Sequence, residues 1–145
     1  MTLQIGSSAP SVKYTNSQGE ETDISNSGQE TWVIFIPFAF TGVCTGEVCD
    51  IRDNPTNYEK DGRETIIVSC DPAPSQKAWG EELGFKGMMI SDFYPHGKIS
   101  KEFDNFNDEL GCSNRVSFLV NEEGKIAKVV AADSLGTSRD LSQYA

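Results

Sequence analysis

Two unbroken apolar runs constrain the fold more than any other feature of this 145-residue sequence. The segments TWVIFI (31–36) and ETIIVSC (64–70) are rich in β-branched residues, and a stretch with a helical pattern follows each of them. Strands that are apolar on both sides are typical of parallel sheets with both faces covered. Alternating strands and helices build a sheet with helices on its faces. We therefore expect a single α/β domain over residues 1–145.

The other patterned segments add strands at both ends of this core. Residues 11–25 alternate around a turn at 17–19, which predicts a β-hairpin. Residues 116–132 predict a second hairpin around the turn NEEGK, and residues 87–91 a short strand. The order predicts a thioredoxin-like fold, with a central mixed sheet flanked by helices and an N-terminal β-hairpin. In open sheets of this kind, ligands bind beyond the carboxyl ends of the strands.

Three helices are expected between these strands. The first covers residues 41 to about 53 with Thr41 as its N-cap, and it ends before Pro55 because proline disfavours helical backbone in the preceding residue. The second lies in the segment 74–85 and ends at Gly84, and the third covers 98–103. The first helix therefore starts at the edge of the sheet where a ligand would bind.

The composition excludes several classes of function. A net charge of −10 opposes binding to nucleic acid or to anionic membranes. No apolar run approaches the length of a membrane span, and the N-terminus has no signal-peptide pattern, so we expect a cytoplasmic protein. In such a reducing compartment, the four cysteines are not expected to form a static disulfide framework. They lack any C-x-x-C spacing, and with one histidine in the chain we expect no metal site.

Cys44 falls in the first turn of the first expected helix. A helix N-terminus presents unpaired N–H groups and a partial positive charge of roughly +0.5, both of which favour an anion. Because the thiolate is the nucleophilic form of cysteine, this position favours reactivity. Thr41 is close enough in sequence to face the same cavity, and Pro37 ends the strand without offering an N–H. A buried cysteine that acts as a small hydrophobic residue stays open as the alternative.

The string PFAFTGVC has the form Pro-x-x-x-Thr-x-x-Cys, which resembles the active-site signature of the peroxiredoxins. Further segments resemble the one-cysteine alkyl hydroperoxide reductase E group of that family in order and spacing: GEVCDIRDN, KAWGEELGF, SDFYPHG and NRVSFLV. The resemblance extends from IGSSAP to about residue 130. It implies a thiol-dependent peroxidase that reduces hydrogen peroxide and alkyl hydroperoxides without a cofactor.

The resemblance also implies a role for each residue of the signature. Cys44 would be the peroxidatic cysteine, Thr41 would hydrogen-bond the peroxide oxygens, and Pro37 would shield the sulfenic acid. Arg115 would activate the thiolate and the peroxide, as a guanidinium that never loses its charge can do. Glu47 matches a glutamate of the family, but it could equally be a helix acid stabilised by the helix dipole.

Cys49 departs from the alkyl hydroperoxide reductase E pattern. A second cysteine five residues after the first resembles the bacterioferritin comigratory protein branch, which implies that Cys49 resolves Cys44 as an intramolecular disulfide. Five residues of ideal helix place the two Cα atoms about 8–9 Å apart, beyond the roughly 7 Å limit for a disulfide. The helix must therefore unwind locally, which Gly42 and Gly46 favour. Resolution by an external thiol, or a sensor that signals through its oxidised form, stays open.

The other two cysteines, the histidine and the aromatic residues near the site are expected to have structural roles. Cys70 and Cys112 are expected to be buried and inert, and His96 to lie in a loop. Five aromatic residues around the expected site are predicted to belong mainly to the core: Phe38, Phe40, Phe93, Tyr94 and Trp79. The resemblance implies thioredoxin, a mycoredoxin or a low-molecular-weight thiol as reductant. The alkyl hydroperoxide reductase E resemblance implies a homodimer, whereas the bacterioferritin comigratory protein resemblance permits a monomer. The missing C-x-x-C argues against a thiol–disulfide oxidoreductase.

Overall fold

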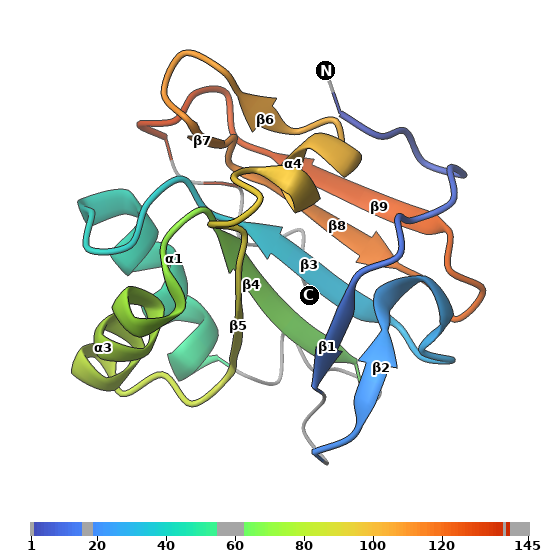
Figure 1. Ribbon diagram of the computed structural model, residues 1–145, viewed down its shortest axis with the longest axis horizontal. Coiled ribbons are helices and arrows are strands. Elements are labelled where there is room, and N and C mark those ends of the chain that lie inside the picture. Colours follow the sequence, from blue (N-terminus) through green and yellow to red (C-terminus); the bar gives the residue numbers. More distant parts are fainter. Residues whose placement is uncertain (1, 16–18, 55–62, 138, 140–145) are drawn as a thin grey trace.

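A five-stranded mixed sheet forms the centre of the computed structural model, which describes residues 2–15, 19–54, 63–137 and 139 (Figure 1). Its strand order is β5-β4-β3-β8-β9, with β3, β4 and β5 parallel and with β8 and β9 antiparallel to their neighbours. The strands are β3 Thr31–Phe35, β4 Glu64–Ser69, β5 Met88–Ser91, β8 Val116–Val120 and β9 Ile126–Ala131. The prediction of a mixed α/β sheet is confirmed.

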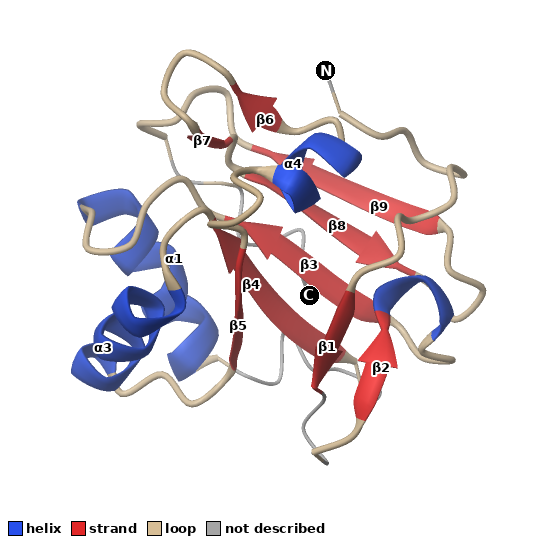
Figure 2. Ribbon diagram, in the orientation of Figure 1, coloured by secondary structure: helices blue, strands red, loops and turns tan. Residues whose placement is uncertain are grey.

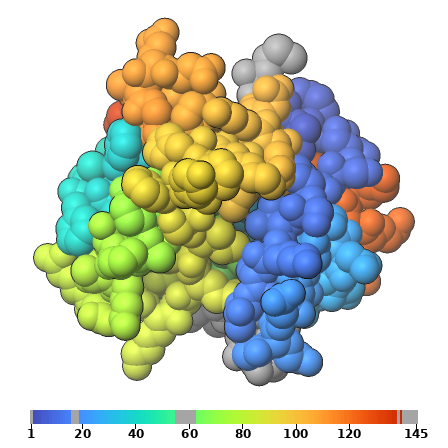
Figure 3. Space-filling model, viewed as in Figure 1, coloured from blue at the N-terminus to red at the C-terminus, as the bar shows by residue number. Residues whose placement is uncertain are grey.

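Helices cover one face of the sheet, and a mixture of shorter elements covers the other (Figure 2). Helices α1 (Gly42–Asp53) and α3 (Ala73–Leu83) lie together on the first face. The second face packs against the hairpin of β1 (Lys13–Thr15) and β2 (Glu21–Asp23), the 3-10 helix η1 (Ile24–Asn26) and the region of α4 (Lys98–Glu102). In the space-filling view the yellow segment after β5, which includes α4, lies across the middle of the visible face, beside the blue N-terminal hairpin (Figure 3).

The alternation of side chains along β3 divides the core into two layers. Trp32 and Ile34 face the two helices, whereas Val33 and Phe35 face the hairpin side. All four side chains are at most 1% exposed. This explains the unbroken apolar run, since a strand covered on both faces needs apolar residues at every position.

Most elements lie where the sequence predicts them. The first helix ends before Pro55, and Gly84 caps α3 in the left-handed conformation with φ of 68°. Part of the predicted turn at 17–19, namely residues 17 and 18, lies outside the described residues. The small ladder of β6 (Phe106–Asn107) and β7 (Cys112–Ser113) was not predicted, because strands of two residues leave no pattern in a sequence. Within the described ranges, no helix is long and apolar enough to cross a bilayer.

Candidate active site

Cys44 lies in the first turn of α1, just beyond the end of β3. Its side chain is 0% exposed and its thiol is free. The helix begins with the bond from the Thr45 N–H to the Thr41 carbonyl, 2.8 Å long. Cys44 packs in the apolar layer that includes Ile36, Val48 and Trp79. The thiol is thus held near the unpaired N–H groups of a helix start, in surroundings that exclude water.

The loop that leads into α1 is fixed by two hydrogen bonds. Asp71, directly after the Cys70 that follows β4, accepts the Ala39 N–H at 2.8 Å. Thr41 has the extended backbone of an N-cap, as predicted, but its hydroxyl donates to the Phe38 carbonyl at 2.8 Å and does not cap the helix. Pro37 is buried at the start of this loop. Thr41 is therefore exposed at the end of this loop, three residues before the buried Cys44.

Arg115 reaches the turn of α1 that carries Cys44. Its Nη1 donates to Glu47 Oε1 at 2.5 Å, and both side chains are 3% exposed. Its other nitrogens donate to the Leu135 carbonyl at 2.8 and 3.2 Å. Glu47 follows Cys44 by three residues, and residues three apart lie on one face of a helix. The ion pair therefore brings Arg115 to the same side of α1 as the thiol.

Arg139 completes this cluster, although no pattern in the sequence singles it out. Its Nε and Nη2 donate to the two oxygens of Glu47 at 2.9 and 2.7 Å, and its backbone N–H donates to Oε2 at 3.0 Å. Its Nη1 also donates to the Phe35 carbonyl at 2.7 Å and to Ser117 Oγ at 2.8 Å. Arg139 belongs to no motif of the sequence, so an isolated arginine near the end of the chain carried no signal.

The two guanidiniums determine the charge state of Glu47. Burial would raise the pKa of this carboxyl group, but the hydrogen bonds and charge of Arg139, together with Arg115, outweigh it and hold the pKa below its ordinary value. Glu47 is therefore ionised at neutral pH. Two positive charges surround one negative charge in this cluster, so an excess of positive charge lies beside the turn of Cys44.

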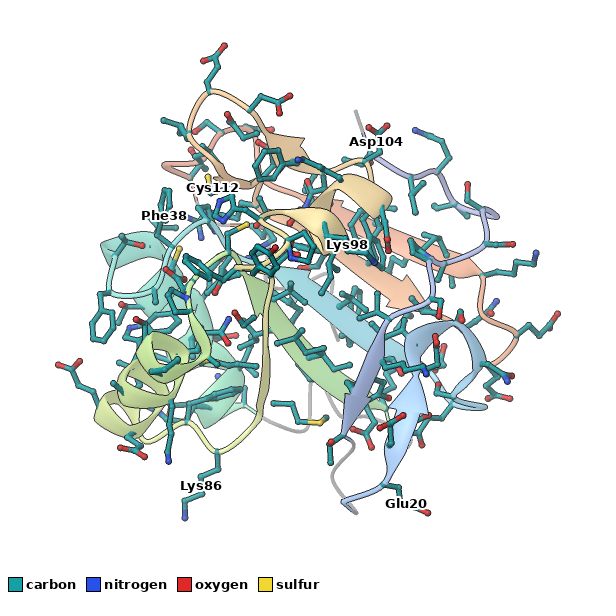
Figure 4. The ribbon with its side chains drawn as sticks, in the orientation of Figure 1. Glu20, Phe38, Lys86, Lys98, Asp104 and Cys112 are labelled. Carbon is teal, nitrogen blue, oxygen red and sulfur yellow. The ribbon has the colours of Figure 1, made fainter. Side chains whose placement is uncertain are left out.

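Cys112 and Cys70 are buried thiols close to the site. Burial raises the pKa of Cys112, with smaller contributions from Cys44 and Asp71, while Arg115 acts in the opposite direction. Burial, followed by the charge of Asp92, raises the pKa of Cys70 to about 11. Figure 4 places Cys112 at the same end of the molecule as Phe38. Thiols with raised pKa values are poor nucleophiles, which agrees with the structural roles predicted for both.

Cys49 lies in the middle of α1 and is half-buried, with a free thiol. Cys44 and Cys49 belong to one continuous helix, Gly42–Asp53. An ideal helix keeps their Cα atoms about 8–9 Å apart on largely different faces, so they cannot bond while the helix is intact.

The prediction that the surrounding aromatic residues belong mainly to the core is wrong for four of the five. Trp79 is 1% exposed, but the other side chains range from 37% to 89% exposed: Phe38, Phe40, Phe93 and Tyr94. These four lie in the loops that follow β3 and β5, where the sheet ends and no layer covers them. His96 lies in the second of these loops, as predicted. Among the described residues, no group of side chains is arranged to hold a metal ion.

The sequence matches the AhpC/TSA family over residues 5–129. The chain belongs to the AhpC/TSA family. It is 33% identical over 126 residues to alkyl hydroperoxide reductase E of Mycobacterium tuberculosis (strain ATCC 25618 / H37Rv), a match that covers 86% of this chain and 82% of the relative. This confirms the resemblance to the alkyl hydroperoxide reductase E group.

Solved structures of peroxiredoxins have the same fold. The AhpC of Enterococcus faecalis aligns with a TM-score of 0.79 at 26% identity, over 99% of this chain and 88% of the other. Peroxidoxin BcpB from Mycobacterium tuberculosis aligns with a TM-score of 0.78 at 22% identity, over 92% of this chain and 89% of the other. The thioredoxin-like fold is confirmed, and this AhpC/TSA protein is a peroxiredoxin, a thiol-dependent peroxidase. The likeness of Cys49 to the bacterioferritin comigratory protein branch stays a prediction.

Proposed function

We propose that this peroxiredoxin reduces hydrogen peroxide and alkyl hydroperoxides at Cys44, with Thr41, Pro37 and Arg115 forming the peroxide site. The observation that carries the proposal is the buried ion pair between Arg115 and Glu47, one turn along α1 from the thiol. The pair fixes the Arg115 guanidinium near the helix end where a thiolate and a peroxide would meet, and with Arg139 the cluster has an excess of positive charge. Pro37 lies at the start of the loop that leads into α1, and Thr41 lies at its end.

The first chemical step breaks the O–O bond of the peroxide. The Cys44 thiolate attacks one oxygen, a S–O bond forms, and the other oxygen leaves as water or an alcohol after it takes up a proton. Sulfur supplies the two electrons of the new S–O bond, and Cys44 becomes a sulfenic acid. Donors of Arg115 and the hydroxyl of Thr41 stabilise the negative charge that develops on the peroxide oxygens. Pro37 shields the sulfenic acid from further peroxide.

In the second step, the Cys49 thiolate attacks the Cys44 sulfur, an S–S bond forms as the S–O bond breaks, and the oxygen leaves as hydroxide, which takes up a proton from solvent to give water. The resulting disulfide requires local unwinding of α1, because the intact helix keeps the two residues apart. Thioredoxin, a mycoredoxin or a low-molecular-weight thiol would then return both cysteines to thiols. If Cys49 cannot reach Cys44, the external thiol attacks the sulfenic acid directly, or the oxidised form serves as a peroxide signal.

The exposed aromatic side chains next to the site support a homodimer. Phe38 and Phe40 follow β3, while Phe93 and Tyr94 follow β5, and all four are exposed. Because β3 and β5 are both parallel to β4, the two loops leave the same end of the sheet, and exposed apolar surface of this kind marks places where proteins associate. Sedimentation velocity of wild type and of Tyr94→Ser tests this part, because a dimer built on these loops is weakened by the substitution.

Mass spectrometry of the peroxide-treated protein tests the chemistry. The reduced protein receives one equivalent of hydrogen peroxide, free thiols are blocked, and peptides are mapped. We expect loss of two hydrogens with Cys44 linked to Cys49. Added oxygen on Cys44 with Cys49 blocked would instead support resolution by an external thiol. Unmodified Cys44 with peroxide still present would refute the proposed peroxidase site.

A further inference from the structure

We infer that the groove between α3 and β5 is a binding site for a small aromatic carboxylate whose ring system carries an N–H donor. The groove encloses about 290 Å³, at the lower end of the range for small-molecule sites. The described residues that line it come from α3, the loop after it and β5, and none of them belongs to the peroxide site. The inference is therefore independent of the way in which Cys44 is resolved.

The C-terminal turn of α3 forms one wall of the groove. Gly84 has a left-handed backbone, with φ of 68°, and the Phe85 N–H donates to the Gly80 carbonyl at 2.9 Å. This hydrogen bond is that of a Schellman motif, which turns the chain back along the helix. The Phe85 ring then lies so close to Gly87 that a Cβ on this glycine would be 2.3 Å from it. An aromatic ring therefore lines the groove on this side.

A glycine inside α3 keeps the floor of the groove open. Gly80 is buried within the helix, where glycine is less favourable than alanine. A Cβ at this position would meet the Phe85 carbonyl at 3.5 Å and Met89 Cε at 3.8 Å, which are both ordinary contacts. The packing therefore does not require a glycine. The missing methyl group leaves space between Phe85 and Met89, which both line the groove.

Gln76 offers the groove a hydrogen-bond acceptor. It is 4% exposed, and its Nε2 donates to Ser69 Oγ at 2.8 Å and to the Ile90 carbonyl at 2.9 Å. Because a carbonyl can only accept, the amide nitrogen is fixed on that side, and Oε1 lies on the other. Oε1 accepts no hydrogen bond from a described residue, and Gln76 lines the groove. A largely buried acceptor without a donor favours a ligand that brings an N–H group.

Two ammonium groups lie at the mouth of the groove. Lys77 on α3 and Lys86 in the loop before β5 both line it and are exposed. Figure 4 shows Lys86 extending from this loop into solvent. Neither lysine forms an ion pair with a described residue. Glu81 is the one acid among the described lining residues, so the mouth has an excess of one positive charge, which favours an anionic group.

The walls, the acceptor and the charge together define the class of ligand. A planar apolar ring suits the wall of Phe85 and Met89, an N–H group suits Gln76 Oε1, and a carboxylate suits the two lysines. A fatty acid lacks the N–H donor, and a sugar acid lacks the apolar ring. Indole-3-acetate combines all three groups in one small molecule and is therefore the probe.

Titration of the isotope-labelled protein with indole-3-acetate, followed by amide chemical shifts, tests the site. We expect a dissociation constant of about 1 mM or lower, with the largest shifts in residues 76–89. Benzothiophene-3-acetate, in which sulfur replaces the N–H, should bind about fivefold more weakly because it cannot donate to Gln76. Indole-3-acetamide, which has no charge, should also bind about fivefold more weakly. Equal or tighter binding of either analogue would assign the groove to a purely apolar occupant and overturn the inference.

Gly80→Ala tests the shape of the groove in a folded protein. The methyl group occupies the floor, so binding of indole-3-acetate should weaken at least about fivefold. Alanine favours the helix, so the free energy of unfolding should not fall. Gly46→Ala is the matched control, because Gly46 also lies in a helix but its Cβ would meet no described atom within 4 Å. The control should leave the affinity unchanged.

The double variant Lys77→Met/Lys86→Met tests the charge at the mouth. Binding of indole-3-acetate should weaken about fivefold, whereas binding of the neutral indole-3-acetamide should stay the same. An equal affinity of wild type and the double variant for indole-3-acetate would overturn the role of the lysines. The whole inference is overturned if about 10 mM indole-3-acetate shifts no amide of residues 76–89, or if Gly80→Ala binds it as tightly as wild type.

Discussion

Replacing Arg139 by methionine tests the charged cluster beside Cys44. Arg139 donates to both oxygens of Glu47, and also to the Phe35 carbonyl and Ser117 Oγ. Methionine fills much of the same volume but leaves Arg115 as the remaining guanidinium on Glu47. Removing one partner of a buried ion pair costs about 3–5 kcal/mol, because an uncompensated charge stays buried. Since Arg115 remains, we expect the free energy of unfolding to fall by about 3 kcal/mol at pH 7.

The loss in this variant should depend on pH. In the wild type the folded pKa of Glu47 is below the ordinary 4.5, so its stabilising contribution is full above that value and is lost as the pH falls through the folded pKa. In Arg139→Met the effect of burial is opposed by one guanidinium, so we expect the pKa of Glu47 to rise. Protonation then relieves the buried charge, and the difference from wild type becomes smaller between pH 7 and pH 5.

Urea unfolding at pH 7 and pH 5, followed by tryptophan fluorescence, measures both effects. Lys98→Met is the control, because it removes an exposed ion pair with Glu102 and should change the stability little at either pH. A loss below about 1 kcal/mol in Arg139→Met at pH 7 would refute the reasoning, since that is the range of exposed pairs. An equal loss at both pH values would show that Glu47 is not the group affected.

Four further predictions concern the site. Arg115→Met should slow the reaction with peroxide about 10²- to 10³-fold in stopped-flow fluorescence, and an unchanged rate would exclude it from the site. Cys49→Ser should keep the rate of the first oxidation but accumulate a sulfenic acid, which dimedone labelling detects; a disulfide in this variant would assign resolution to another cysteine. Because the pKa of Cys70 is raised to about 11, iodoacetamide at pH 8 should label Cys49 and spare Cys70, as peptide mapping would show. Asp71→Ala leaves the Ala39 N–H without its acceptor and should reduce the free energy of unfolding by about 1–3 kcal/mol in urea titrations; no loss would mean that water replaces the carboxylate.

The sequence was most informative where a pattern repeats over a whole element. The apolar run of residues 31–36 predicted β3 because burial on both faces requires an apolar residue at each position. The position of Cys44 at the start of α1 followed from the same boundary, with Thr41 as the first residue outside the helix. The bounds of β3 and the start of α1 depend on residues that are neighbours in the sequence, so a local pattern predicts them.

The features that were missed depend on contacts between distant segments. Arg139 reaches Glu47 from 92 positions away, and no local pattern indicates such a pair. The exposure of Phe38 and Tyr94 depends on which layers cover the ends of β3 and β5, whereas their chemical type alone suggested the core. The hydroxyl of Thr41 donates to the Phe38 carbonyl across Phe40, and no residue preference would suggest the left-handed backbone of Phe40.

The distance along the chain between Glu47 and Arg139 affects how the protein is made. A ribosome releases the helix with Cys44 long before it releases Arg139, so a nascent chain holds the thiol without its full set of charges. Contacts of such long range form late in folding, because closing the loop between them costs chain entropy. The charged cluster around Glu47 is therefore completed only after Arg139 has been synthesised and has folded back onto α1. In a protein built this way, two segments that lie far apart in the sequence must meet before Glu47 has both of its guanidinium partners.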